Sequence, residues 1–364
     1  MSLVEELQRK KGGLRTVQEL KDRSKPLLDE CNNSSRSGVQ DFKNNIHAVN
    51  LENWYPQLKE YTFETTFLNL SQEEARAIVS TYQQKQRQEC GKEQPAAEEE
   101  EQLHLLSQLK ERINDGIKAF VGGEGEDGGA FVRLSTRSPK DATIAGDKTM
   151  RLFEEELERM EKEEQVENAR EDENARLVAL IVASTKAMMV RSGEEALQLI
   201  TTSERSHEDL LLALEFPEEW DMKVIIRKWV NIHPSMEFRG FVCHKKFTAL
   251  SQYFHIAYFP QLKQQRNSIL ANITECYAKV QDLIPVDSFI VDFAVLNDGQ
   301  VLVIELNPFH NYEGCGTDAG LFNWALDRKI VDGEAPFEFR VREEAFDVKQ
   351  NLIGLWRDIV RFPK

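Results

Sequence analysis

Two apolar stretches on either side of an Asn-Asp-Gly turn constrain this chain more than any other feature, because acidic side chains interrupt both. They lie within residues 289–308, and Asp-Gly between alternating runs is a strong β-hairpin signal. If the Asp-Gly pair forms a two-residue loop, Asp292 lies directly opposite Glu305, and Asn307 lies on the same face. Burial of the other face fixes the register. That face is predicted to contain Phe289, Val291, Phe293, Val295, Leu302, Ile304 and Leu306.

The polar face of this hairpin is a candidate metal site. Two carboxylates that face each other across a ladder repel, so Asp292 and Glu305 favour a cation between them. Carboxylate and amide oxygens suit Mg²⁺, and Asn307 supplies the amide. Alternatively, these three side chains form the solvated face of an edge hairpin. A solvated face is usually polar throughout, whereas Ala294 and Val303 separate the polar positions here, so the metal site is favoured.

The chain is strongly acidic. Its 364 residues include 46 Lys and Arg against 62 Asp and Glu, which gives a formal net charge of −16. This charge argues against nonspecific binding to nucleic acid or to anionic membranes and favours a basic protein surface as the partner. Five cysteines without a CxxC pair indicate neither a disulfide framework nor a zinc site. Without a signal core or an apolar run of about 20 residues, we expect a soluble, cytoplasmic protein. We also expect a monomer.

Changes in composition divide the chain into four parts. Residues 1–45 are polar and helix-prone, and we expect a helical or partly disordered arm. An N-terminal lobe is predicted over 46–222, with an acidic linker at 91–102 whose self-repulsion disfavours packing. A C-terminal lobe that contains the hairpin is predicted over 223–342, and a terminal helix or tail is predicted over 343–364.

Local signals predict further elements. Residues 54–70 are aromatic and rich in strand formers, and the capping box of Ser71 and Glu74 should open a helix after them. Residues 150–174 are predicted to form one highly charged helix with a solvated face.

A cluster of cations and hydroxyl groups follows a short predicted strand within residues 130–142. Its cations are Arg133, Arg137 and Lys140, and its hydroxyl residues include Ser138. In an acidic protein such a cluster is a candidate cradle for phosphate, although it lacks the P-loop spacing. A surface turn without a ligand is the alternative.

Several further motifs occur along the chain in a fixed order. They are Trp54-Tyr55-Pro56, the acidic linker, Phe131-x-x-Leu134 with Ser138-Pro-Lys-Asp-Ala142, Arg227-Lys228-Trp229, Glu237-Phe238-Arg239, Ser251-Gln252, Asp292 with Glu305-Leu306-Asn307-Pro308-Phe309, and Leu321-Phe322-x-Trp324. As an ordered set over about residues 50–342, they resemble the eukaryotic cell division cycle protein 123 family. The arm and the tail after Arg342 depart from the family pattern, which favours a divergent paralogue.

The resemblance implies an α+β fold of the ATP-grasp type, in which two α+β lobes with mostly antiparallel sheets enclose a nucleotide cleft. It also implies that ATP and Mg²⁺ are bound. The residues that it places at the nucleotide are Arg133, Ser138, Lys140, Arg227, Lys228, Trp229, Val230, Arg239, Gln252 and Asp292. It places Mg²⁺ on Asp292, Glu305 and Asn307, in agreement with the pairing argument above.

Two functions are compatible with the resemblance. The first is an ATP- and Mg²⁺-binding assembly factor for the translation initiation factor 2 complex, with the gamma subunit of that factor as partner. The alternative is an ATP-grasp ligase that forms an acyl-phosphate and then an amide bond. Such a ligase needs further cations at an acceptor site, and the sequence offers Arg133, Arg137, Lys140 and Arg239 alone. Because fold does not fix function, we favour the assembly factor and leave hydrolysis of ATP open.

Overall fold

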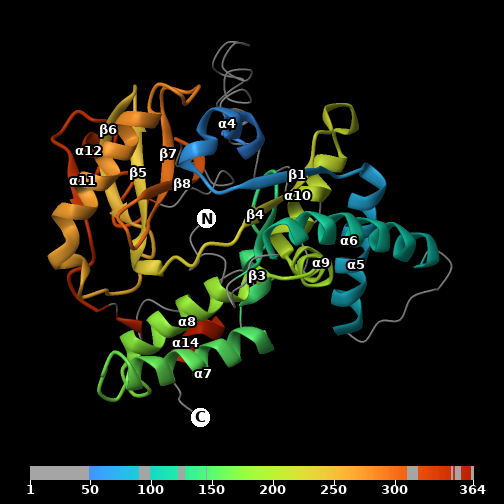
Figure 1. Cartoon of the computed structure of the whole chain (residues 1–364), viewed down its shortest axis with the longest axis horizontal. Helices are drawn as coiled ribbons and strands as arrows, with labels where there is room; N and C mark the ends of the chain where they lie inside the picture. The colour runs from blue at the N-terminus through green and yellow to red at the C-terminus, as the bar shows by residue number, and fades with distance from the viewer. Residues whose placement is uncertain are drawn as a thin grey trace.

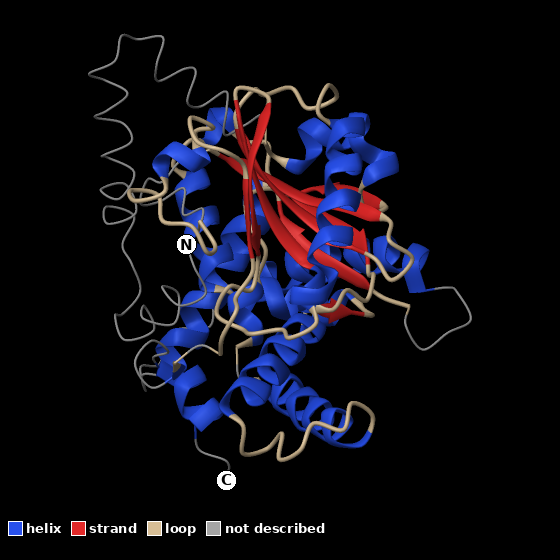
Figure 2. Ribbon diagram, turned by 90° about the vertical axis from the view of Figure 1, so that its left-hand side faces the viewer, coloured by secondary structure: helices blue, strands red, loops and turns tan. Residues whose placement is uncertain are grey.

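The computed structural model describes seven stretches of the chain, which are residues 49–89, 99–121, 128–144, 146–309, 319–345, 347–348 and 354–361. Their strands form two sheets that are each accompanied by helices, so the architecture is α+β with two lobes (Figure 1). Figure 2 shows the strands in the interior with helices around them. None of the helices in these stretches is long and apolar enough to cross a membrane. The predicted arm lies outside the described residues.

The first sheet has four strands in the order β1-β4-β2-β3, and neighbouring strands are antiparallel. They are β1 (Thr65–Asn69), β2 (Ala130–Leu134), β3 (Met189–Val190) and β4 (Lys223–Lys228). The middle of β4 consists of Val224, Ile225 and Ile226, which are completely buried. We expected a second lobe to begin at residue 223. Instead, β4 pairs with β1 and β2 and belongs to this first sheet.

Four helices share one hydrophobic core with the first sheet. They are α5 (Gln72–Glu89), α6 (Glu99–Val121), α9 (Gly193–Thr202) and α10 (Glu204–Leu214). The capping box before α5 is confirmed, because the Ser71 amide donates to Glu74 at 2.9 Å and the Glu74 amide donates to Ser71 Oγ at 3.2 Å. Helix α6 begins within the predicted acidic linker, so the end of that linker is helical.

The second sheet has five strands in the order β8-β7-β5-β6-β9, and only the β6–β9 pair among them is parallel. They are β5 (Glu237–Cys243), β6 (Lys246–Gln252), β7 (Phe289–Val295), β8 (Val301–Pro308) and β9 (Glu338–Arg340). Helix α11 (Leu262–Val280) packs on one face through the main hydrophobic core. Helix α12 (Arg328–Val331) contributes to a smaller core with Phe241 and Ile290 on the other face.

Three helices lie below the two sheets in the view of Figure 1. They are α7 (Asp147–Lys162), α8 (Glu173–Ala187) and α14 (Gly354–Arg361). The prediction of one helix over 150–174 is wrong, because α7 ends at Lys162 and a turn separates it from α8. Asn168 adopts positive φ in that turn, a backbone conformation that asparagine tolerates better than most residues.

The remaining elements are short. They are α4 (Leu51–Leu58) and the 3₁₀ helices η1 (Lys59–Tyr61), η2 (Lys140–Thr143), η3 (Pro217–Glu219) and η4 (Pro234–Met236). The strand-rich prediction for 54–70 is therefore wrong before β1. Burial of Trp54 and Leu58 along one side of α4 outweighs the strand preference of its aromatic residues.

The β7–β8 hairpin has the predicted central pairing but not the predicted turn. Asp292 lies directly opposite Glu305, as expected. The loop contains three residues rather than two, because the Leu296 amide donates to the Gln300 carbonyl oxygen at 2.8 Å and Gly299, with φ 85°, closes the turn. This longer loop shifts the pairing next to the turn by one residue, and a β-bulge further along β8 reverses the shift.

The bulge also changes which side chains share a face. Val303 is completely buried in the main core with Phe293, whereas Leu302 and Ile304 pack on the opposite face near Phe63. The predicted apolar face is therefore wrong at Leu302 and Ile304. The alternation of side chains between the two faces of β8 is interrupted at the bulge. The one extra residue there places the side chains before the bulge on the opposite face from the one predicted.

Candidate functional site

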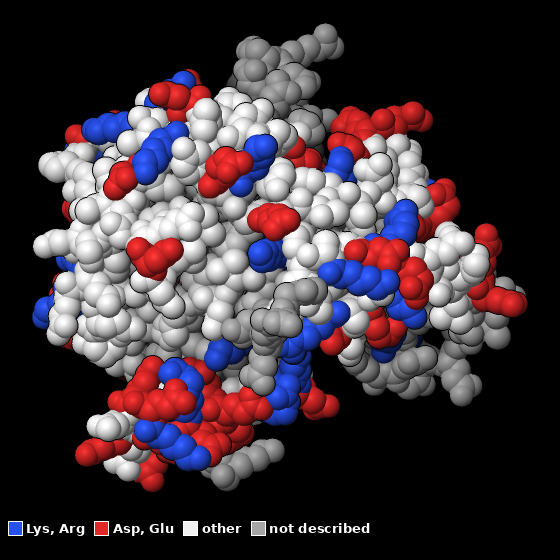
Figure 3. Space-filling model, in the orientation of Figure 1, with Lys and Arg blue, Asp and Glu red and all other residues white. Residues whose placement is uncertain are grey.

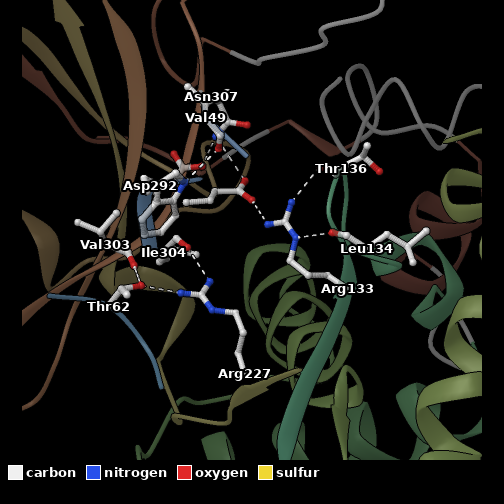
Figure 4. A network of polar contacts seen from close by, with 12 residues as sticks. Val49, Thr62, Arg133, Leu134, Thr136, Arg227, Asp292, Val303, Ile304 and Asn307 are labelled. Atoms are coloured by element: carbon white, nitrogen blue, oxygen red, sulfur yellow. Dashed lines mark hydrogen bonds and ion pairs between the residues drawn. The ribbon is translucent and has the colours of Figure 1, made fainter. Parts of the chain in front are cut away.

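Polar side chains from both lobes meet where β2 approaches the β7–β8 hairpin (Figure 4). Within the second sheet, Arg239 on β5 pairs in register with Asp292 on β7. Arg239 Nε and Nη2 donate to the two Asp292 carboxylate oxygens at 2.8 and 2.7 Å. Both side chains are buried, and the guanidinium also lies over the Tyr253 ring at 4.9 Å from the centroid. A bidentate buried pair fixes both rotamers, so the Asp292 carboxylate has a defined position.

Glu305 makes an ion pair that joins the two lobes. Its Oε2 accepts a hydrogen bond from Arg133 Nη1 on β2 at 2.6 Å. Arg133 also donates to the carbonyl oxygens of Leu134 and Thr136, so one orientation of the guanidinium is held (Figure 4). The Glu305 side chain is 27% exposed, whereas that of Arg133 is 8% exposed. The pair is therefore open to solvent on the carboxylate side.

Asn307 lies beside both carboxylates. Its Nδ2 is 3.3 Å from Asp292 Oδ2 and 3.4 Å from Glu305 Oε1, so these two oxygens converge on one point. Turning the amide over would present its oxygen to the same point. Three converging oxygens fit Mg²⁺. Since no group of three His, Cys, Asp or Glu side chains in the described residues is arranged to hold a metal ion, the amide oxygen is needed to complete such a site.

The two carboxylates have different electrostatic surroundings. Burial raises the pKa of Asp292, and the charge of Glu305 adds to this rise while Arg239 opposes it. Burial acts in the same direction on Glu305. There, however, Arg133, Lys140 and Arg239 outweigh burial and lower the pKa of Glu305 to about 2. Glu305 is therefore ionised at neutral pH, which suits a metal ligand.

Residues 133–143 span the end of β2, the turn after it and η2, and we call them the basic turn; they are anchored to α10. Arg137 Nε donates to Asp209 Oδ1 at 2.9 Å. Asp141 accepts a hydrogen bond from the first amide of α10 at 2.7 Å. The predicted phosphate contacts Ser138 and Lys140, both half-buried, therefore lie on a turn of fixed shape.

A third carboxylate, that of Glu237, is missing from the predicted site residues. It lies on the same face of β5 as Arg239. Burial, together with the charges of Asp292 and Glu305, raises the pKa of Glu237 to about 8, while Lys140 opposes the rise. Alternation along Glu-Phe-Arg on β5 is the sequence signal that could have identified it.

Two predicted nucleotide contacts are buried side chains that form hydrogen bonds within the protein. Arg227 is 3% exposed, and its guanidinium donates to the Ile304 carbonyl oxygen and to Thr62 Oγ1, at 2.6 and 2.7 Å. Gln252 is completely buried, and its amide bonds to three backbone groups of its own lobe. Both side chains therefore support the fold around the site.

The three residues after Arg227 have different surroundings. Lys228 is exposed, with Nζ 4.0 Å from Glu64 Oε2. The Trp229 amide donates to the Gly129 carbonyl oxygen at 2.9 Å, which ties this connection to the start of β2. Val230 packs in a small apolar cluster that includes Leu302 of the second sheet. The segment therefore links the two lobes.

Comparisons with known proteins agree with the predicted resemblance. Residues 178–353 match the D123 family model. A protein of Dictyostelium discoideum named translation initiation factor eIF2 assembly protein is 36% identical over 152 residues, which are 35% of this chain and 38% of that protein. The protein of the same name from Xenopus laevis is 30% identical over 112 residues, 30% of this chain and 32% of that protein. The match therefore spans about a third of the length of these relatives.

A solved structure extends the similarity to most of the fold. Cdc123 from Schizosaccharomyces pombe superposes with a TM-score of 0.56 and 18% identity, over 83% of this chain and 98% of that chain. At this identity the likeness concerns the fold. The predicted α+β fold with mostly antiparallel sheets is confirmed, and so is the predicted resemblance to this family.

Proposed function

Since the chain resembles the cell division cycle protein 123 family in sequence and in fold, we propose that it is an ATP- and Mg²⁺-binding assembly factor for translation initiation factor 2. The name of its matched relatives, translation initiation factor eIF2 assembly protein, supports the assembly role. The part that matches the family model includes the strands that carry Arg239, Asp292 and Glu305.

The convergence of Asp292 and Glu305 oxygens beside Asn307 is the observation that carries the metal part of the proposal. These three side chains would hold Mg²⁺. The ion would supply positive charge there that neutralises part of the charge of bound phosphates. The low pKa of Glu305 supports an anionic ligand at that position, and the bidentate ion pair with Arg239 fixes the position of the Asp292 carboxylate.

The cations around this pair would bind the phosphates. Arg133 and Arg239 flank the two carboxylates, and Lys140 with Ser138 approaches from the basic turn. The connection at Lys228, Trp229 and Val230 would hold the adenine through backbone groups. Arg227 and Gln252 are left out of the proposed contact set, because their polar groups bond within the protein.

Calorimetric titration with ATP, with and without Mg²⁺, tests the nucleotide part. We expect tighter binding with Mg²⁺, and a gain in unfolding free energy of about 2.7 kcal/mol at a hundredfold excess over Kd. Glu305→Gln should lose the Mg²⁺-dependent part of the affinity. Asp287→Asn removes an exposed carboxylate on the same lobe and should bind as the wild type does. A melting temperature unchanged by millimolar ATP and Mg²⁺ would overturn this part.

We further propose that the gamma subunit of translation initiation factor 2 is the partner. The net charge of −16 supports a basic surface on that partner. Acidic side chains, with Lys and Arg side chains among them, gather over α7 and its surroundings (Figure 3). The attraction between such exposed charges and a basic partner weakens when the salt concentration rises. Assembly of the purified subunits should be faster with this chain than without it, and more so at low salt. Equal assembly with and without the chain would contradict the role.

A further inference from the structure

The β-bulge in β8 leaves one residue outside the ladder. Asp292 pairs with Glu305 and Phe293 pairs with Val303, so Ile304 has no pairing partner on β7. Backbone groups at a bulge lose ladder hydrogen bonds, and buried ones need other partners. The bulge therefore forms where the surroundings supply such partners.

Two side chains near the first sheet supply them (Figure 4). Arg227 Nη1 donates to the Ile304 carbonyl oxygen at 2.6 Å, and Thr62 Oγ1 donates to the Val303 carbonyl oxygen at 2.7 Å. Arg227 Nη2 donates to Thr62 Oγ1 at 2.7 Å, so the two side chains act as one unit, which we call the clasp. The Arg227 guanidinium also lies over the Phe63 ring at 4.7 Å from the centroid.

The bulge decides on which face Glu305 lies. If the pairing next to the turn continued unbroken, Ile304 would lie opposite Asp292, and Glu305 would lie opposite Val291 on the core side of the hairpin. The carboxylate would then enter the apolar core. The extra residue moves Glu305 to the face of Asp292, where Arg133 reaches it.

We propose that Thr62 and Arg227 are positioning residues for Glu305. The clasp holds the bulge through two backbone carbonyl groups, and the bulge presents the Glu305 carboxylate beside Asp292. This role differs from the predicted contact of Arg227 with nucleotide. Of the Arg227 nitrogens, Nε is buried and has no hydrogen-bond partner in the described part of the chain, while the other two are used by the clasp.

The effect on ligand binding rests on the proposed function. Outer-shell groups that orient a metal ligand change metal affinity by about tenfold to a hundredfold. Thr62→Val keeps the side-chain shape and removes the hydroxyl, whereas Thr62→Ser keeps the hydroxyl. We expect Thr62→Val to weaken ATP binding about tenfold with Mg²⁺ and to leave it unchanged without Mg²⁺. Thr62→Ser should match the wild type. The same Mg²⁺ dependence in all three proteins would overturn the inference.

Hydrogen exchange without ligand tests the clasp independently of nucleotide binding. We expect the amides of residues 303–306 to exchange faster in Thr62→Val than in the wild type or Thr62→Ser, with α11 as an unchanged internal reference. Arg227→Lys keeps the charge but replaces the two guanidinium nitrogens that reach the two clasp partners with a single nitrogen on a different stem. It should therefore behave as Thr62→Val does, and it serves if that variant does not fold. Wild-type protection of these amides in both variants would contradict the positioning role. A wild type that does not bind ATP would contradict the proposed function alone.

Discussion

A 2.6 Å hydrogen bond joins Arg133 Nη1 on β2 to Glu305 Oε2 on β8, across 172 residues of sequence. Arg239 binds Asp292 in the same way within the second sheet. Each carboxylate of the facing pair therefore has its own guanidinium, and the repulsion between them is balanced within the protein. The cations that the facing acids require are supplied in part by arginines, and the proposed Mg²⁺ would use the carboxylate oxygens that converge at Asn307.

Asp292→Asn should destabilise the protein by about 3 kcal/mol, because buried Arg239 would lose its counter-charge. Glu305→Gln should cost about 1 kcal/mol, since its arginine partner keeps hydrogen bonds to two carbonyl oxygens. Urea unfolding without ligand measures both. Asp287→Asn, at an exposed surface pair, is the control and should change stability by a few tenths of a kcal/mol. An effect of Asp292→Asn as small as that of the control would show that the buried pair contributes little.

Glu237 should make the folded protein less stable as pH rises. Burial and the neighbouring acids raise its pKa from 4.5 to about 8, so the unfolded chain loses this proton first. The stability contributed by the protonated side chain is present below the unfolded pKa and is lost as pH rises through the folded pKa. Glu237→Gln should gain about 1 kcal/mol over the wild type between about pH 5 and about pH 8, after allowance for solvent screening. Urea unfolding of the wild type and Glu237→Gln at the two pH values, without Mg²⁺, measures this difference. Equal changes in unfolding free energy in the two proteins would show that Glu237 has an ordinary pKa.

The pairing of Asp292 with Glu305 could be predicted because a period of two and one buried face fix a register. The loop length and the β-bulge that produce this pairing could not be predicted. An Asn-Asp-Gly sequence allows both two- and three-residue loops, and the one-residue error in the loop is cancelled by the bulge. The partners that stabilise the bulge, Thr62 and Arg227, are distant in sequence, so no local pattern indicates them.

The partners of the acids were beyond prediction for a similar reason. The spacing of cations in the basic turn indicates an anion site but not which cation already binds an acid. Arg133 binds Glu305 and Arg137 binds Asp209, which leaves different roles for side chains that look alike in the sequence. Tertiary contacts of this kind, and not local propensity, assign the roles.

His207 should make the protein less stable as pH falls, the opposite of Glu237. It is buried on α10 and stacks on Tyr82, with ring centroids 4.5 Å apart, and burial lowers its pKa from 6.5 to about 4. The neutral ring stabilises the fold above the unfolded pKa, and this contribution is lost as pH falls towards the folded pKa. The wild type should lose about 2 kcal/mol more than His207→Asn between about pH 7 and about pH 5. Urea unfolding checks this, with exposed His104→Asn on α6 as the variant that should follow the wild type. A slope retained in His207→Asn would assign the acid sensitivity to another group.

Arg133→Gln should weaken ATP binding in the presence of Mg²⁺ by about tenfold or more, because a charge-assisted contact to phosphate would be lost. Arg133→Lys should fall between this variant and the wild type. Lysine keeps the charge but cannot hold the carbonyl oxygens of Leu134 and Thr136 while it also reaches a phosphate. Lys279→Gln removes the same unit of charge from an exposed site on α11 and should leave the affinity close to that of the wild type. Calorimetry on the four proteins at one salt concentration makes the comparison. Equal losses in Arg133→Gln and Lys279→Gln would mean that the nucleotide responds to net charge and not to the side chain that joins the two lobes.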